Sequence, residues 1–469
     1  MRNAAIRLTA ITSLAIAAFL KAQRPRRRQA HRSETSADYE RAKTRILILG
    51  GGFGGATAAI ELDRQLRGVA DLSILLVDRA NAQVFVPLLW SVAAGSASPA
   101  SVTVPLRTLQ RGRAFHVLNA EVEGIDLEER VVHTSAGDRN YDILIVALGS
   151  VTTVPDLPGV REHVHIFRGP ADAVELRNYL IDAIERAHRA TDPAEHDAWR
   201  TFVVAGGGDT GCELAAAIDE YIRGTLRKLY PWLVAQPPRI VVVQRDHRLV
   251  PLSPPRVSTL LRAHLEAQGI EVQTGVSVER ITDDGVHTSA STIPTRTVFW
   301  ATGVSAPDVV RTMRAAHEKN GALTVDGCLR LPGHPNVYAI GDNAWALDGV
   351  TGAPVPALAQ AAEHQAQYVA RTVAASLRGE PSVPFEFTKV GQLTLLGGHD
   401  GIVEIGRITI TGLPAWLAWH AYYLLHIDSW RNRILLAADW LLTTLVGRES
   451  SQLRLHNERS TSPENARTG

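Results

Sequence analysis

The sequence predicts an α/β protein with two Rossmann-like folds and a C-terminal helical segment that associates with a membrane. Three stretches support this prediction: a glycine-rich turn after an apolar run at 45–55, a second such turn at 201–213, and an aromatic-rich segment at 413–446. A strand, a glycine turn, a helix and a second strand in that order are typical of a parallel βαβ unit. The expected divisions are 1–44 (N-terminal extension), 45–160 and 321–395 (two parts of the first fold), 161–320 (second fold), 396–450 (membrane-association segment) and 451–469 (polar tail).

The first glycine turn has the spacing of a dinucleotide-binding motif. The apolar residues 46–49 lead into G-x-G-x-x-G, in which Gly50 forms the tight turn and Gly52 lets the backbone approach a pyrophosphate. Gly55 lets the helix pack against the strand, and the helix N-terminus favours the phosphate charge. Asp78 ends the next apolar run, where a carboxylate can accept hydrogen bonds from a ribose 2′-OH.

The same pattern occurs a second time. The predicted strand 201–205 leads into a turn that contains Gly206, Gly208 and Gly211, and the next predicted strand is 240–244. Two such motifs predict two dinucleotides. A chain that holds two dinucleotides usually moves a hydride between them, although this step is an analogy from fold to function.

Composition excludes several classes of protein. The chain has 469 residues, enough for two or three domains, and a net charge of +1 gives no indication of nucleic-acid binding. The two cysteines, Cys212 and Cys328, form no C-x-x-C motif, so a redox disulfide beside a flavin is not expected. No cysteine–histidine cluster has zinc spacing, and no metal site is predicted.

The N-terminal extension has two open interpretations. Residues 8–20 are mostly apolar and a basic block follows at 21–28, which is typical of a weak membrane anchor. A disordered tail is the alternative, and a cleaved signal peptide lacks a convincing cleavage site. Residues 31–43 are expected to form a polar linker.

Other elements follow from the apolar pattern between these motifs. Helices are predicted at 171–190 and 254–268, and an apolar loop with a central proline at 85–95. Three further apolar runs end in glycine turns at Gly149, Gly303 and Gly341.

The C-terminal segment indicates contact with a membrane surface. Four of the nine tryptophans lie within 413–446, and aromatic rings are enriched at membrane interfaces. The apolar run 434–438 ends at Asp439 and is too short to span a bilayer. We therefore expect this segment to lie in the plane of the interface. A buried helical pair or a dimer contact is the alternative.

Together these motifs resemble the type II NADH dehydrogenases (NADH:quinone oxidoreductases), within the superfamily of flavoproteins with two dinucleotide-binding folds. The resemblance covers roughly residues 44–450. The motifs that carry it are Gly50–Gly55, Asp78, Phe85-x-Pro87-Leu88-Leu89, Ala147-Leu148-Gly149, Gly206–Glu213, Ala301-Thr302-Gly303, Gly341-Asp342, Ala359-Gln360-Ala361-Ala362, Lys389-x-Gly391 and Trp416-Leu-Ala-Trp419.

The resemblance implies that the first fold binds FAD and that the second binds NADH or NADPH. The candidate cofactor-binding residues are Gly50, Gly52, Phe53, Gly54, Gly55, Asp78, Pro87, Ala147, Gly149, Gly206, Gly208, Gly211, Gln244, Arg245, Gly303, Gly341 and Asp342. The candidate catalytic residues are Glu213, Gln360, His364 and Lys389. Two of them have a plainer interpretation as well: the helix dipole alone explains an acid such as Glu213, and Lys389 is equally suited to a solvated surface.

The sequence departs from the family pattern in three ways. Gln244 and Arg245 stand where the family usually has an acid for the NADH ribose, which predicts use or tolerance of NADPH. Asp209 replaces a proline and is expected either to cap the helix or to weaken nucleotide binding. His364 replaces a glutamine, so it either donates a proton to the reduced quinone or simply fills space.

The function that the resemblance implies is hydride transfer from NAD(P)H to FAD, followed by electron transfer to ubiquinone or menaquinone without proton pumping. The expected protein is a homodimer, peripheral on the cytoplasmic face of the cell membrane. A sulfide:quinone oxidoreductase would need working cysteines, and a ferredoxin reductase would lack the aromatic C-terminal segment. A non-catalytic sensor of nucleotide state is a further alternative.

Overall fold

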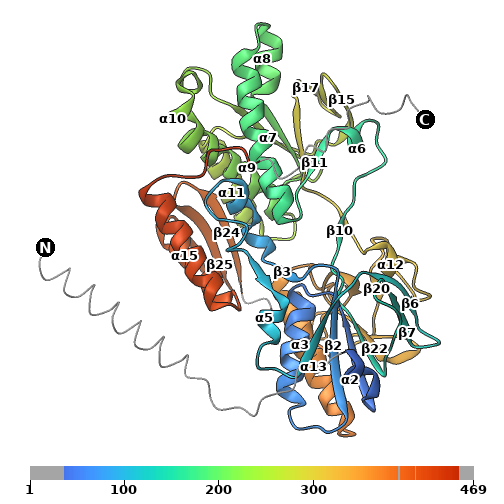
Figure 1. The fold of residues 1–469 in the computed structure, drawn as a ribbon. Helices are drawn as coiled ribbons and strands as arrows, with labels where there is room; N and C mark the ends of the chain where they lie inside the picture. The colour runs from blue at the N-terminus through green and yellow to red at the C-terminus, as the bar shows by residue number, and fades with distance from the viewer. Residues whose placement is uncertain (1–35, 389–390, 407, 454–469) are drawn as a thin grey trace, which may run out of the picture.

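Two large sheets, one mainly parallel and one fully parallel, form the centres of the two lobes of the molecule (Figure 1). The computed structural model describes residues 36–388, 391–406 and 408–453. The α/β fold predicted from the sequence is confirmed. The two interpretations of the N-terminal extension concern residues outside this range, as does most of the predicted polar tail.

The first lobe is built on a six-stranded sheet in the order β21-β22-β9-β1-β2-β5. Its centre is β1 (Thr44–Leu49), which pairs in parallel with β2 (Leu72–Asp78) and β9 (Ile143–Val146). Both apolar faces of such a sheet must be covered, which explains why these strands are continuous apolar runs. The sheet also contains β5 (Phe115–Asn119), β21 (Arg330–Leu331) and β22 (His334–Ala339). Because β22 pairs in parallel with β9, the chain returns to this sheet after building the second lobe.

Helices α3 (Phe53–Gln65) and α13 (Ala359–Leu377) lie side by side in the lower lobe of Figure 1. Small residues allow this close packing. A side chain at Gly54 would come within 3.2 Å of Ile340 and 3.7 Å of the Ala362 side chain. The glycine turn at the start of α3 is thereby placed next to the first turns of α13.

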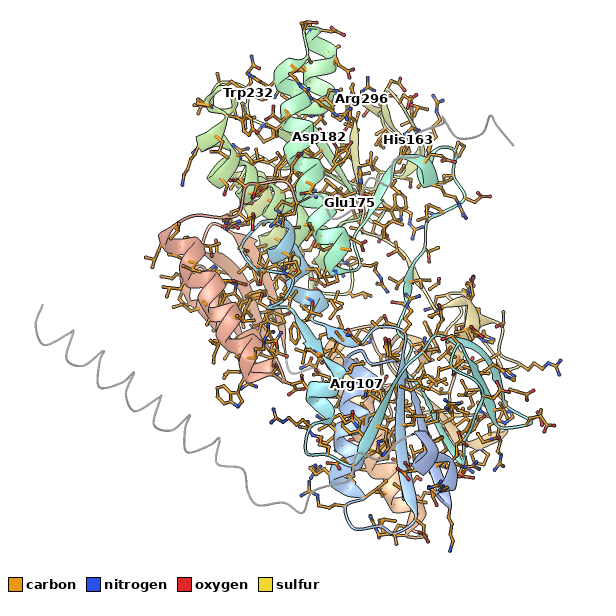
Figure 2. The ribbon with its side chains drawn as sticks, viewed as in Figure 1. Arg107, His163, Glu175, Asp182, Trp232 and Arg296 are labelled. Atoms are coloured by element: carbon orange, nitrogen blue, oxygen red, sulfur yellow. The ribbon has the colours of Figure 1, made fainter. Side chains whose placement is uncertain are left out.

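The second lobe contains a five-stranded parallel sheet in the order β11-β18-β12-β13-β14. Its strands are β11 (Val164–Ile166), β12 (Thr201–Ala205), β13 (Arg239–Gln244), β14 (Glu271–Thr274) and β18 (Thr297–Trp300), and its main helices are α7 (Pro170–Arg189), α9 (Asp209–Tyr221) and α11 (Pro255–Ala267). The helices predicted at 171–190 and 254–268 correspond to α7 and α11. On α7, Figure 2 labels the exposed Glu175, and Asp182, which forms an ion pair with Arg186 at 2.7 Å.

Two short strands join the lobes. β10 (Val151–Thr152) leaves the first lobe and pairs antiparallel with β19 (Val304–Ser305), where the chain leaves the second sheet. Figure 1 shows β10 in the narrow region between the lobes. The ends of β9 and β18, which carry Gly149 and Gly303, therefore lie near this crossing.

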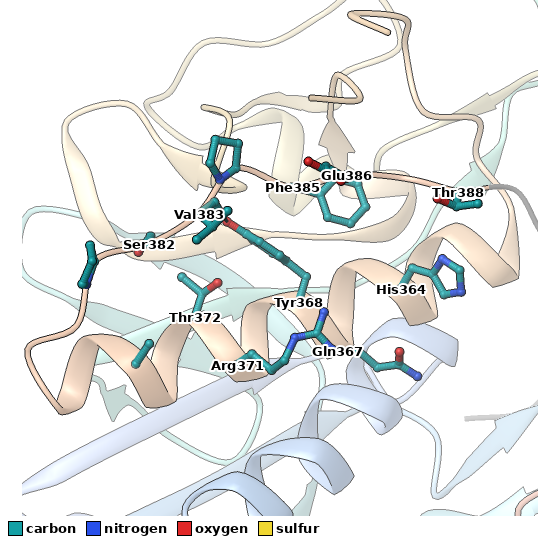
Figure 3. Close-up of a pocket in the computed structure, with 13 residues that line it drawn as sticks. His364, Gln367, Tyr368, Arg371, Thr372, Ser382, Val383, Phe385, Glu386 and Thr388 are labelled. Atoms are coloured by element: carbon teal, nitrogen blue, oxygen red, sulfur yellow. Dashed lines mark hydrogen bonds between the residues drawn. The ribbon is translucent and has the colours of Figure 1, made fainter. Parts of the chain in front are cut away.

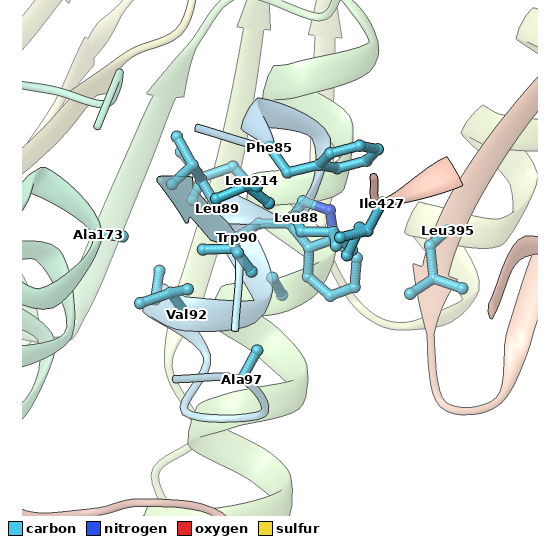
Figure 4. Packing of buried hydrophobic residues seen from close by; sticks show 14 of the residues in the cluster. Phe85, Leu88, Leu89, Trp90, Val92, Ala97, Ala173, Leu214, Leu395 and Ile427 are labelled. Carbon is cyan, nitrogen blue, oxygen red and sulfur yellow. The ribbon is translucent and has the colours of Figure 1, made fainter. Parts of the chain in front are cut away.

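The sequence-based expectations for two segments were wrong. The predicted loop at 85–95 forms a 3₁₀ turn, η1 (Val86–Leu88), and a short helix, α4 (Leu89–Ala93). Its Leu88 and Trp90 are buried in the cluster shown in Figure 4. The predicted linker at 31–43 contains α2 (Ser36–Arg41), since Tyr39 is fully buried and its hydroxyl donates to the carbonyl of Asn140 at 2.9 Å.

The C-terminal segment forms a sheet and two helices. The sheet contains β24 (Gln392–Gly397), β25 (Asp400–Ile405) and β26 (Ile408–Thr411), and the helices are α14 (Leu413–His426) and α15 (Trp430–Leu445). Since β24 continues across residue 395, the sheet begins slightly before the expected division. In the part of the chain that the structure describes, no helix has the length and apolar character needed to cross a bilayer.

One buried side chain attaches α15 to the first lobe. Asn432 is fully buried, and its amide nitrogen donates to the carbonyls of Ala100 at 3.0 Å, Ser101 at 3.2 Å and Thr103 at 2.8 Å. Ser429 donates to the Asn432 amide oxygen at 2.8 Å and also caps α15.

The remaining elements complete the two lobes. They are β3 (Ala82–Val84), β4 (Thr103–Pro105), α5 (Leu106–Gln110), β6 (Val122–Asp126), β7 (Val131–Thr134), β8 (Arg139–Asn140), α6 (Val160–His163), α8 (Pro193–Trp199), η2 (Ile222–Leu226), α10 (Arg227–Leu229), η3 (Pro231–Val234), β15 (Val278–Thr282), β16 (Gly285–Thr288), β17 (Thr292–Ile293), α12 (Asp308–Arg311), β20 (Leu323–Thr324), η4 (Gly341–Asn343) and β23 (Ala344–Trp345).

Asn432→Ala tests this attachment. The substitution leaves three carbonyl groups without their amide donor, so we expect the free energy of unfolding to fall by about 1–3 kcal/mol. The measurement is urea unfolding, with Arg431→Ala as the control because Arg431 is exposed on the same helix. Equal stability of the two variants would contradict the proposed role of Asn432.

Candidate functional site

The first glycine turn is fixed by close approaches between backbone atoms. Gly50 has a φ of +99°, and a side chain there would overlap the carbonyl oxygen of Ala147. A side chain at Gly55 would overlap the carbonyl oxygen of Gly50. By contrast, a side chain at Gly52 would meet no atom of the described residues within 4 Å. The turn is therefore closed on the protein side and open at Gly52, where a pyrophosphate can approach the backbone.

The second glycine turn repeats this geometry. Gly206 has a φ of +118°, and a side chain there would come within 2.9 Å of the carbonyl oxygen of Ala301. A side chain at Gly211 would overlap the carbonyl oxygen of Gly206, whereas Gly208 again faces open space. The structure thus contains two matching turns, each at the N-terminus of a helix.

Each turn is also held by the side chain that ends the following strand. In the first turn, Asp78 accepts hydrogen bonds from the backbone N–H groups of Gly51 at 2.5 Å and Ala80 at 2.6 Å. Burial raises the pKa of Asp78, and these two hydrogen bonds act in the opposite direction. In the second turn, the buried side chain of Gln244 accepts a hydrogen bond from the Gly207 N–H at 2.8 Å.

A polar network links the two lobes beside Asp342. The Asp342 carboxylate accepts a hydrogen bond from the Ser150 hydroxyl, and the guanidinium of Arg168 donates to the Ser150 hydroxyl and carbonyl oxygens. Burial lowers the pKa of Arg168, while the charge of Asp342 raises it. Arg168 lies between β11 and α7, so a residue of the second lobe helps to fix an acid of the first. Sequence reasoning did not identify Arg168.

The first turn and its surroundings fit a flavin dinucleotide. Gly341 donates its N–H to Gln365 at 2.6 Å, and Asn343 donates its side-chain N–H to the Gly149 carbonyl at 2.7 Å. The other amide atom of Asn343, Oδ1, is buried and has no hydrogen-bond partner among the described residues, so it can accept a hydrogen bond from a bound molecule. Together with the open space at Gly52 and Gly149, this acceptor suits FAD.

Glu213 lies at the junction between the second fold and the C-terminal sheet. It is the fifth residue of α9, and its carboxylate accepts a hydrogen bond from the Leu395 N–H of β24 at 3.3 Å. Burial, and then the charge of Asp209, raise the pKa of Glu213 well above its ordinary value. Asp209 is the acidic residue in the first turn of α9, whereas Glu213 lies beyond that turn. The helix dipole is therefore a weak explanation for Glu213. The residue that caps α9 is Gly208, so the first of the two alternatives for Asp209, that it caps the helix, is wrong, and the second, that it weakens nucleotide binding, stays a prediction.

The first turns of α13 carry the predicted quinone-facing residues. Gln360 and His364 are half-buried there, and the ring of His364 packs edge-on against Phe387 with centroids 5.8 Å apart. Burial, with a smaller effect of Arg371, lowers the pKa of His364. Lys389, the remaining predicted catalytic residue, lies outside the described residues.

His364 also lines a pocket of about 610 Å³ between α13 and residues 381–388 (Figure 3). Gln367, Tyr368 and Arg371 continue the α13 wall of this pocket. The pocket thus extends along α13 away from its first turn, so His364 marks only one end of it.

Glu363 is a second titratable group that sequence reasoning missed. Burial, and then the nearby charge of Asp428, raise the pKa of Glu363 to about 7. Asp428 lies between α14 and α15, so the charge of the C-terminal segment acts on the first turns of α13. No local sequence signal indicates this pairing, because the two residues are far apart in the chain.

An aromatic series connects the first glycine turn with the C-terminal helices. The Phe53 ring packs edge-on against Phe85 with centroids 5.0 Å apart, and Phe85 contacts Tyr423 at 5.7 Å. Tyr423 in turn packs against Trp419 at 4.4 Å, within α14. The C-terminal helices are therefore in continuous ring contact with the turn that fits FAD.

This fold and this pair of turns define the class of α/β oxidoreductases that bind two dinucleotides. The pattern of the pyridine nucleotide-disulphide oxidoreductase family matches residues 44–366, and that of the NDH2 C-terminal domain matches residues 390–449. Together with the similarity to the Mycobacterium tuberculosis protein described next, these matches show that the chain belongs to the type II NADH:quinone oxidoreductase family.

Individual relatives agree with this assignment. The chain is 31% identical over 423 residues to the type II NADH:quinone oxidoreductase Ndh of Mycobacterium tuberculosis, covering 86% of this chain and 89% of the relative. It is 28% identical to the demethylphylloquinone reductase NdbB of Synechocystis, covering 86% and 97% of the two chains. The solved structure of NDH2 from Plasmodium falciparum in complex with NADH has the same fold, with a TM-score of 0.78 at 20% identity, over 87% of this chain and 100% of that one.

Substitutions of two glycines separate cofactor binding from folding. Because Gly52 faces open space, Gly52→Ala should leave the stability of the FAD-free protein unchanged and weaken FAD binding by at least about tenfold. Gly55→Ala forces a side chain onto the Gly50 carbonyl, so it should lower the stability of the FAD-free protein by about 2 kcal/mol or more. Thermal unfolding and FAD titration measure the two effects, and similar behaviour of both variants would contradict the assignment.

The pKa of Glu363 predicts a pH-dependent stability. The folded protein binds the proton of the Glu363 carboxyl group more tightly than the unfolded chain does. Protonation of Glu363 therefore stabilises the folded state fully below about pH 4.5, and this stabilisation is lost as the pH rises through about 7. Relative to wild type, Glu363→Gln should therefore become more stable by about 1–3 kcal/mol between about pH 5 and pH 8.

Urea unfolding at both pH values measures this difference. Glu175→Gln is the control, because Glu175 is exposed on α7. If the effect of Glu363→Gln relative to wild type is the same at both pH values, the raised pKa is wrong.

Proposed function

We propose that this protein is an FAD-dependent NAD(P)H:quinone oxidoreductase that works at a membrane surface. The observation that carries the proposal is the matched geometry of the two glycine turns, one open at Gly52 and the other at Gly208. The names of the relatives support the choice of acceptor, since they include reductases of quinones. Ubiquinone and menaquinone are both candidate acceptors.

Each lobe then has a distinct task. In the first lobe, the open backbone at Gly52 receives the FAD pyrophosphate, and Asp342, held by Ser150 and Arg168, faces the ribitol side. In the second lobe, Gly206, Gly208 and Gly211 bind the nicotinamide dinucleotide. When bound, FAD supplies the redox chemistry, accepting a hydride and returning two electrons to the quinone.

Glu213 and the first turns of α13 serve the reacting ends of the two substrates. Glu213 is held by the Leu395 N–H, so its position is fixed relative to β24 as well as to α9. We assign it to the nicotinamide end. Gln360, His364 and Pro87 line the approach of the quinone in this proposal, and Glu363 holds a proton at its carboxyl group below about pH 7. Lys389 is proposed to act near the flavin. The domain divisions predicted from the sequence remain proposals.

The C-terminal segment is proposed as the membrane-binding surface. Large apolar side chains are exposed over β25, β26, α14 and α15; they are Ile405, Ile408, Ile410, Leu413, Leu417, Leu425, Trp430, Ile434, Leu441, Leu442, Leu445 and Val446. An exposed apolar surface of this kind, with Arg433 stacked over the Trp430 ring at 5.1 Å, suits the boundary between headgroups and acyl chains. Attachment to the cytoplasmic face and assembly as a homodimer are part of the same proposal.

Thiol chemistry is not proposed. Cys212 is fully buried, and its Sγ contacts the carbonyl oxygen of Gly207 at 3.6 Å. Burial raises the pKa of the Cys212 thiol well above its ordinary value, which disfavours the reactive thiolate. These features favour a packing role and argue against sulfide oxidation.

Separate measurement of the two half-reactions tests the proposed function. In stopped-flow experiments without oxygen, NADH should reduce the bound flavin, and a water-soluble ubiquinone or menaquinone analogue should reoxidise it. Bound flavin that neither NADH nor NADPH reduces would favour the non-catalytic sensor. Purified full-length protein that cannot bind FAD would overturn the proposal.

Vesicle binding tests the membrane surface. The double variant Leu441→Glu/Leu445→Glu places charges at residues that are 60% and 72% exposed, so it should weaken binding to anionic lipid vesicles by at least about tenfold. The matched control is Val234→Glu/Leu252→Glu, at residues of the second lobe that are 66% and 85% exposed. Cosedimentation measures both variants, and equal binding by both would reject this surface.

A further inference from the structure

The loop after β13 contains an acid that the sequence analysis did not use. The side chain of Gln244 makes two hydrogen bonds: its Oε1 accepts from the Gly207 N–H at 2.8 Å, and its Nε2 donates to the Asp246 carboxylate at 2.9 Å. Gln244 is buried, whereas Asp246 is exposed. The amide of Gln244 therefore holds a carboxylate beside the second glycine turn.

In the first turn, one residue both binds an N–H group of the turn and supplies the carboxylate at the strand end. Asp78 ties the turn through the Gly51 N–H and also brings a carboxylate to the strand end. In the second turn the tasks are divided, because Gln244 makes the equivalent bond to Gly207 and Asp246 supplies the charge. A neutral residue at the strand end thus does not leave the second fold without an acid.

The loop that carries Asp246 is folded back against the glycine turn. The Asp246 carbonyl accepts a hydrogen bond from the Gly275 N–H at 2.9 Å, and the Val250 N–H donates to the Gly207 carbonyl at 2.8 Å. The guanidinium of Arg248 donates to the carbonyls of Ser253 at 2.6 Å and Pro251, so this cation is engaged within the loop. These bonds fix the backbone on both sides of Asp246.

We propose that Asp246 determines the choice of reductant by accepting a hydrogen bond from the 2′-hydroxyl of the adenosine ribose of NADH. The same carboxylate repels the 2′-phosphate of NADPH, since two negative charges within hydrogen-bonding distance of each other are unfavourable. Gln244 is the positioning residue. This inference rests on the proposed function, and it replaces the expectation of NADPH tolerance drawn from Gln244 and Arg245.

Steady-state kinetics with a water-soluble quinone test the inference. Wild-type protein should prefer NADH over NADPH in kcat/KM. Asp246→Asn should reduce this preference by about tenfold to a hundredfold, chiefly through the KM values and with little change in kcat. Gln244→Glu/Asp246→Asn should restore the preference, because the carboxylate introduced at position 244 would keep an acceptor for the Gly207 N–H and also supply the missing charge. Arg245→Ala tests the alternative in which Arg245 binds the 2′-phosphate, and the inference predicts that this variant keeps the preference for NADH.

Binding measurements separate this inference from the proposed function. Calorimetric titration of the FAD-loaded protein with NAD⁺ and NADP⁺ gives the same discrimination without any need for turnover. Failure of quinone reduction would count against the proposed function. The ratio of the affinities for NAD⁺ and NADP⁺ would still decide the role of Asp246. A wild-type protein that binds NADP⁺ as tightly as NAD⁺, or an unchanged ratio in Asp246→Asn, would overturn the inference. A shift toward NAD⁺ in Arg245→Ala would assign 2′-phosphate binding to Arg245 and overturn it equally.

Discussion

Close contact between backbone atoms at the two glycine turns is the constraint on which the rest of the structure depends. At each turn the first glycine lies against the carbonyl group at the end of a neighbouring strand, and the last lies against the carbonyl of the first. Gly50 and Gly206 can take these positions because glycine accepts positive φ angles without steric cost. The strand end, the helix N-terminus and the open middle glycine are thereby fixed together, which forms an anion site before any ligand binds.

The C-terminal segment connects this nucleotide-binding core with the proposed membrane surface. Asn432 holds α15 against the first lobe, and the ring series from Phe53 to Trp419 holds α14 against the first glycine turn. Most of the exposed apolar side chains lie on the same two helices, and the others lie on β25 and β26. A membrane bound at this surface would therefore lie close to the first turns of α13, which suits a lipid-soluble acceptor.

Much of the fold could be predicted from the sequence because its signals are local. Continuous apolar runs that end in glycines identified the central strands, and helical spacing identified α7. The short helix α4 was missed because five residues are too few to show a period. Arg168 and Glu363 were missed because their partners, Ser150 and Asp428, come from distant elements. Asp246 was visible in the sequence, but only the bond from Gln244 shows how it is placed.

The central claim is that the two turns hold a donor and an acceptor close enough to react. A crystal structure of the full chain with FAD and NAD⁺ tests this most directly. The account predicts one pyrophosphate at Gly52, the other at Gly208, and the nicotinamide ring stacked on the isoalloxazine at about 3–3.5 Å. A nucleotide bound away from Gly208, or two ring systems separated by protein, would contradict it.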